Sequence, residues 1–219
     1  MPDSTHNVEQ LLKRIEETLV ATIPGTIRQM EVDERAYCVF IVFHDTTVVD
    51  DYRSHLVVAA ERLRRELFES KQDAADIVWN PSLLDVHEVS PGCVVEGPDL
   101  KEAFHELYRA LIDDWNDERT EEDAILSPIR LTMHRIARAL NQLNWCEVLE
   151  TTDDFVVVAI DDNGWDPQAD MRACINPQRL ALLDSRGLFE NRTATCPQCG
   201  KDLPTPQAKQ CFDCGADWH

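Results

Sequence analysis

Residues 36–43 read AYCVFIVF, the longest apolar run in the chain. Successive side chains of a strand point to opposite faces, so apolar residues at every position predict a strand that is covered on both sides. A second run, FVVVAI at residues 155–160, predicts another interior strand. Residues 147–150 precede it across the turn 151–154, and we expect the two segments to form a hairpin.

Helical spacing of apolar residues predicts helices around these strands. The first helix is capped by Asn7 and ended by Pro24-Gly25. Further helices are predicted over residues 52–68, from Asp99 to Trp115, from Ser127-Pro128 to Leu143, and from Asn176-Pro177 to a stop at Gly187, with short extended pieces at 76–79, 84–89 and 93–96. This order predicts an α+β domain over residues 1–192, with a small mixed or antiparallel sheet covered by helices.

Two knuckles, CPQCG and CFDCG, lie near the end of the chain. Cysteines three residues apart on a tight turn can hold one tetrahedral ion, and the glycine that follows lets the turn adopt positive φ. We therefore predict a four-cysteine zinc ribbon over residues 193–219, with Cys196, Cys199, Cys211 and Cys214 as ligands. Iron in the same four-thiolate geometry is the alternative. Four thiolates leave no open position, so we expect the metal to stabilise the fold and not to act as a Lewis acid.

Disulfides are the competing explanation for the cysteines. The chain opens MPDSTHNVEQ, without a cationic or apolar leader, so we expect a cytoplasmic protein with reduced thiols. Cys38, Cys93, Cys146 and Cys174 have no paired spacing, and we predict that they are buried thiols. No apolar run approaches the length of a membrane span.

The formal net charge is −20. Segment 196–219 holds three acids and two lysines, so nearly all of this charge belongs to residues 1–195. Such a field repels phosphate backbones and favours a protein partner with a basic surface. The candidate contact residues are acids of the stretch 113–123 and two tryptophans: Asp113, Asp114, Asp117, Glu118, Trp165 and Trp218. A solvated linker between helices is the simpler explanation of the acidic stretch.

The sequence holds weak signals for catalysis. His44-Asp45 follows the first predicted strand, and Asp50 and Asp51 come shortly after, so these four side chains are the candidate site of a hydrolase-like enzyme. Residues 161–166, DDNGWD, lack the pattern of an EF-hand loop and predict a turn. The common nucleotide-binding, metalloprotease and serine-hydrolase motifs are absent from the sequence.

Several segments within residues 8–190 resemble a bacterial family of unknown function, family 4303. The resemblance rests on AYCVFIVF, on IVWNPSLLDVHE around Trp79, on the helix 129–143, and on FVVVAI followed by INPQRLALL. It implies a compact bacterial α+β module without established chemistry, of a general type that includes toxin-neutralising binders.

Three functions remain open at this point. The leading hypothesis is a non-enzymatic protein-binding module with a structural zinc ribbon, acting as an inhibitor or immunity-type factor in bacterial conflict or defence. The second is the hydrolase-like enzyme. The third is an accessory subunit of a nucleic-acid-associated complex, with Lys201 and Lys209 of the ribbon as its cationic anchors.

Overall fold

The computed structural model describes residues 4–43, 54–70, 74–81, 93–95, 98–114, 128–161, 167–189, 196, 198–199, 210 and 214–217. Its elements, in chain order, are α1 (Ser4–Gln29), β1 (Ala36–Phe43), β2 (His55–Ala60), α2 (Glu61–Ser70), α3 (Ala74–Ile77), β3 (Cys93–Val94), α4 (Pro98–Asp114), α5 (Pro128–Leu140), the 3-10 helix η3 (Trp145–Glu147), β4 (Thr151–Asp161), α6 (Pro167–Cys174) and α7 (Pro177–Ser185).

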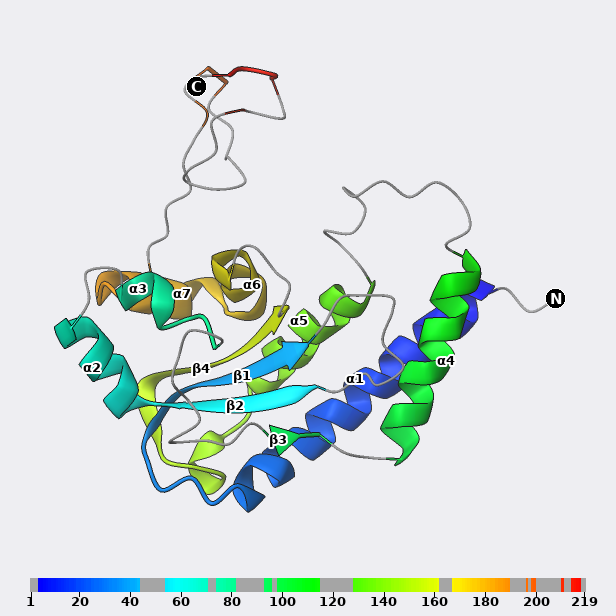
Figure 1. The fold of residues 1–219 in the computed structure, drawn as a ribbon, viewed down its shortest axis with the longest axis horizontal. Helices are drawn as coiled ribbons and strands as arrows, with labels where there is room; N and C mark the ends of the chain where they lie inside the picture. Colours follow the sequence, from blue (N-terminus) through cyan, green and yellow to red (C-terminus); the bar gives the residue numbers. More distant parts are fainter. Residues whose placement is uncertain are drawn as a thin grey trace.

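The described strands form one four-stranded mixed sheet in the order β3-β2-β1-β4. Strand β1 runs antiparallel to β2 and parallel to β4. In Figure 1, α1 and α4 lie side by side on one side of the sheet, and α3, α6 and α7 lie on the other. The predicted fold class, helices covering a small mixed sheet, is confirmed.

Strand β1 forms the centre of the core. All eight of its residues are buried, as the uninterrupted apolar run predicted. Helices α1 and α5 direct apolar stripes towards it, including Leu19 and Ile23 of α1 and Ile136 of α5, each with 0% of its surface exposed. Burial of this apolar surface supplies most of the driving force for folding.

A buried ion-pair network joins α2 to β4 and α7. Arg64 donates two hydrogen bonds to the Asp154 carboxylate, both of 3.1 Å, and it also pairs with Glu61. Its guanidinium carbon lies 4.8 Å from the centre of the Tyr37 ring, and Arg186 reaches Asp154 at 3.1 Å. Because each buried charge has partners, the network fixes the helices on the sheet without leaving an unpaired ion.

Side chains cover the outer edge of β4, the last strand on its side of the described sheet. The Asn141 side chain accepts a hydrogen bond from Val157 N at 2.8 Å and donates one to Val157 O at 2.7 Å, as a neighbouring strand would. Two residues along, the Cys174 thiol contacts Ala159 N at 3.4 Å and Ala159 O at 3.7 Å. These contacts satisfy backbone groups that an open edge would leave available for aggregation.

Several predicted segment boundaries are wrong. Helix α1 begins at Ser4 and so contains Asn7, its predicted cap, and α5 ends at Leu140 and not at Leu143. The predicted helix 52–68 is strand β2 followed directly by helix α2, because the run HLVVAA joins the sheet before the helix begins. Helix α1 continues through Pro24 to Gln29, since Ile23 and Ile27 extend its buried stripe. Residues 74–77, which overlap the predicted extended piece 76–79, are helical.

The predicted hairpin before residue 155 is also wrong. Residues 145–147 form a 3-10 helix, and β4 is a single strand that pairs in parallel with β1. Helix α6 was not predicted at all. The helices that begin near residues 98, 128 and 177 are confirmed, as are the short strand at 93–94 and the helix end before Gly187, whose φ is +68°.

Candidate metal centre

Three of the four predicted ligands lie together near the end of the chain. The sulfur atoms of Cys196, Cys199 and Cys214 all lie within 4.8 Å of one another. They come from two knuckles that are separated in the sequence, and Figure 1 shows the described part of this segment apart from the helices and the sheet. The three cysteines therefore form a group able to bind a metal ion. Cys211, the fourth predicted ligand, lies outside the described residues.

The spacing of the sulfurs distinguishes a metal site from a disulfide. Cys196 Sγ and Cys214 Sγ are 3.6 Å apart, and both cysteines are free. A disulfide requires about 2.0 Å between sulfurs. A tetrahedral zinc ion with Zn–S bonds of about 2.3 Å holds its sulfurs about 3.8 Å apart. The observed separation therefore fits two ligands of one tetrahedral ion.

The backbone of the second knuckle has the conformation that the site needs. Gly215 directly follows Cys214 and has a φ of +71°, in the region that favours glycine. Gln210 and Asp217, on either side of this knuckle, form an antiparallel bridge. Residues 210 and 217 are thus paired as the two arms of a ribbon hairpin would be.

Cys196 is prepared to act as a thiolate. Desolvation opposes ionisation, but hydrogen bonds from the backbone amides of Cys199 and Gln198, and from the neighbouring thiols, outweigh it and lower the pKa of Cys196 to about 7. Gln198 N lies 3.3 Å from Cys196 Sγ. Thiolates are the form that metals bind, so the turn favours coordination before the ion arrives.

A second cluster of polar side chains lies at the carboxyl end of β4. Asp170 is 1% exposed; its Oδ1 atom lies 2.7 Å from His134 Nε2 and 2.8 Å from Arg130 Nη2. Its Oδ2 atom accepts a bond of 3.4 Å from Asp161 N. Asp170 therefore bonds to the outer edge of β4, as Asn141 and Cys174 do, and it also joins α5 to α6. His134 is itself buried, at 7% exposure.

The other predicted site residues are only partly described. His44, Asp45, Asp50, Asp51, Asp117, Glu118, Trp165 and Trp218 lie outside the described residues. Asp113 and Asp114 form the end of α4, but their side chains are not described. The possible partner-binding and hydrolase sites therefore stay predictions, and so does the domain boundary at residue 192.

The cysteines of the body differ in exposure. Cys38 and Cys174 are buried, as predicted, and burial raises the pKa of Cys174 to about 12. Cys93 is half-buried. Cys146 is exposed, so the prediction of a buried thiol is wrong there; it lies in the 3-10 helix η3, whose buried residue is the neighbouring Trp145.

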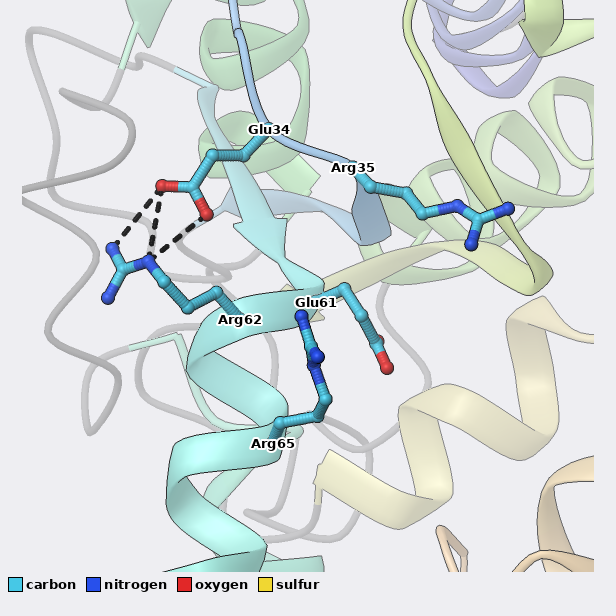
Figure 2. A pocket seen from close by; sticks show the side chains of 5 residues that line it. All are labelled: Glu34, Arg35, Glu61, Arg62 and Arg65. Atoms are coloured by element: carbon cyan, nitrogen blue, oxygen red, sulfur yellow. Dashed lines mark hydrogen bonds and ion pairs between the residues drawn. The ribbon is translucent and has the colours of Figure 1, made fainter.

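A surface hollow of about 320 Å³ lies between the segment that leads into β1 and helix α2. Figure 2 shows the side chains that line it. Its lining consists of Glu34, Arg35, Glu61, Arg62 and Arg65. Arg62 pairs with Glu34 at 3.2 Å and with Glu66 at 3.0 Å. Glutamates of the hollow and its surroundings thus already engage this arginine, and we assign the hollow no ligand.

No protein-family model, curated protein or solved structure matches this chain. The resemblance to family 4303 therefore stays a prediction. No helix among the described residues has both the length and the apolarity needed to cross a membrane.

The sequence analysis missed the residues that cover β4. Asp170 and Cys174 are four residues apart and so share one face of α6, which is a signal that the sequence contains. That signal could be interpreted only with the knowledge that β4 is an edge strand. Asn141 has no comparable signal, since an asparagine after a helix is common.

Proposed function

We propose that this protein is a non-enzymatic, cytoplasmic protein-binding module whose C-terminal ribbon is held by a structural zinc ion. The observation that carries the proposal is the approach of three cysteine sulfurs within 4.8 Å of one another, at a spacing that fits a tetrahedral ion. With Cys211 as the fourth ligand, the shell is complete. Such a centre folds the chain around it and offers no position to a substrate. Metal-binding thiolates also require a reducing compartment, which supports a cytoplasmic location.

Charge supports a protein partner with a basic surface. The net charge of −20 gives the molecule a strong negative field, which accelerates association with cationic surfaces and opposes nucleic-acid backbones. A compact acidic body with a small metal-held attachment suits an inhibitor or immunity-type factor. In this proposal the body provides the docking surface, and the ribbon adds a second, separately stabilised contact element.

Affinity capture tests this proposal. The full-length, metal-loaded protein is immobilised, exposed to native lysate at low and at high salt, and the bound proteins are identified by mass spectrometry. We expect one stoichiometric partner with a basic surface, bound at low salt and released at high salt. Recovery of no stoichiometric partner at low salt, or of nucleic acid in its place, contradicts the proposal. Capture on the C196S variant measures the contribution of the ribbon, with C146S as the matched control.

One observation favours the hydrolase as a second candidate. Strands β1 and β4 are parallel, with Phe43 opposite Asp161, so β1 ends at the edge of the sheet where Asp161 and Asp170 lie, and His44-Asp45 are the next residues in the sequence. Ligands of sheets with parallel strands often bind at this edge. A panel of ester and phosphoester substrates tests the idea: hydrolysis that is lost in H44A supports an enzyme, and unchanged hydrolysis in H44A excludes this site.

A further inference from the structure

The ends of helices α5 and α6 and the start of α7 surround a groove of about 380 Å³. This volume lies at the lower end of the range for small-molecule sites. The lining residues are Arg138, Asn141, Gln142, Arg172, Ala173, Cys174, Ile175, Asn176, Pro177 and Leu180. Among the described lining residues there are two arginines and no carboxylate, in a protein whose net charge is −20. The groove is therefore a cationic site on an acidic molecule.

The polar groups of the groove are mainly hydrogen-bond donors. Arg138 uses its Nε atom to bond Ala173 O, and no described carboxylate forms an ion pair with it, so its two terminal nitrogens remain for a ligand. Asn176 uses its oxygen to cap α7, accepting a bond of 2.8 Å from Arg179 N, and keeps its Nδ2 group as a donor. Arg172 adds a second positive charge. Donors with positive charge match a ligand that carries acceptor oxygens and negative charge.

The groove also has an apolar wall. Ile175, Pro177 and Leu180 lie along the connection from α6 into α7. A fully hydrated inorganic anion gains nothing from such a wall, whereas a short hydrocarbon body does.

The hollow in Figure 2 provides an internal comparison. It has a similar volume, about 320 Å³, and three arginines, but two glutamates share its lining, and one of them, Glu34, pairs with Arg62 at 3.2 Å. The part of the α5–α7 groove that the structure describes has no such acid in its lining. Clustered arginines alone thus do not distinguish the groove; the lack of a carboxylate among its described lining residues does.

We propose that the α5–α7 groove binds a small organic acid. Its carboxylate accepts hydrogen bonds from Arg138 and Asn176, beside the positive charge of Arg172, and its short apolar body lies against Ile175 and Leu180. This site is independent of the metal centre and adds a small-molecule ligand to the proposed protein-binding role.

The test is a titration of the full-length, metal-loaded protein followed by amide NMR. Butyrate is the probe, butyramide is the neutral analogue of the same shape, and inorganic phosphate is the anion without an apolar body, all at constant ionic strength. We expect butyrate to give saturable shifts in the amides around residues 138–142 and 172–180. We expect no saturable shift with butyramide and weaker binding of phosphate.

Two variants test the groove directly. N176D keeps a residue type that caps helices equally well and adds a negative charge to the groove, and R138Q removes one positive charge. We expect each to weaken butyrate binding roughly threefold to fivefold, the range of an exposed charge pair. R65Q, in the hollow of Figure 2, is the matched control and should leave binding unchanged. Thermal unfolding of each variant confirms that it is folded.

Three results overturn the proposal. The first is butyrate binding in N176D that equals wild-type binding. The second is shifts that map away from α5 to α7, or no saturable shift at all. The third is phosphate binding tighter than butyrate, which would make the site one for an inorganic anion.

Discussion

Removing the Asn141 side chain should destabilise the protein by about 2–4 kcal/mol. In the structure this amide satisfies both Val157 N and Val157 O on the outer edge of β4, at 2.8 and 2.7 Å, and it also reaches Cys174 O at 3.2 Å. A single hydrogen bond contributes about 1 kcal/mol net, and a buried group left without a partner costs about 1–3 kcal/mol. Asn141 is half-buried, so in N141A water can reach part of the site. The expected destabilisation is therefore smaller than the sum of the separate hydrogen-bond and unpaired-group costs.

Urea unfolding followed by circular dichroism measures this effect, with the metal present throughout. Q142A is the matched control, because Gln142 is the next residue and is exposed. We expect Q142A to change the free energy of unfolding by less than about 0.5 kcal/mol, as is usual for surface substitutions. The slope of the free energy against urea should not change. A value for N141A within about 0.5 kcal/mol of Q142A would refute the edge-cover explanation.

Two further predictions concern buried groups. Desolvation raises the pKa of Asp154, but the hydrogen bonds and the charge of Arg64 outweigh it, so the pKa is lowered overall. The ionised Asp154 therefore stabilises the folded state fully above the pKa of an unfolded aspartate, about 3.9. This stabilisation is lost as the pH falls further. The free-energy difference between wild type and D154N should therefore shrink below about pH 4 in urea unfolding curves, and a difference independent of pH contradicts this. Among the body cysteines, Cys146 should react with a thiol reagent in the native state, whereas Cys38 and Cys174 should react only after unfolding; native labelling of Cys174, read by mass spectrometry, would contradict its burial.

The central strand was predictable because its signal is local and complete. Every residue of β1 is apolar, and no exposed surface strand or amphipathic helix has that pattern. Strand β2 was not predictable in the same way. Leu56, Ala59 and Ala60 also fit the spacing of the helix that follows, and the strand passes into α2 without a turn residue. Pairing with β1, a tertiary contact, decides between the two structures.

The cluster of three cysteines was predictable for a related reason. Ligand spacing within a knuckle depends on local chain geometry, so CPQCG and CFDCG indicate a site without any knowledge of the fold. The polar cover of β4 depends on strand order instead. Asn141 and Asp170 acquire their roles only because β4 lies at the edge of the described sheet, and β4 itself was predicted as half of a hairpin. Side chains that serve a tertiary arrangement are therefore recognised only after that arrangement is known.

Metal analysis of the purified protein tests the central claim most directly. Elemental analysis by mass spectrometry should find one zinc ion per chain in wild type and in C146S, and none in C196S or C214S. The body of the two ligand variants should stay folded, since the ribbon is held by the metal and the core is not. Wild-type protein without zinc, iron in its place, or zinc retained in C214S would contradict the account.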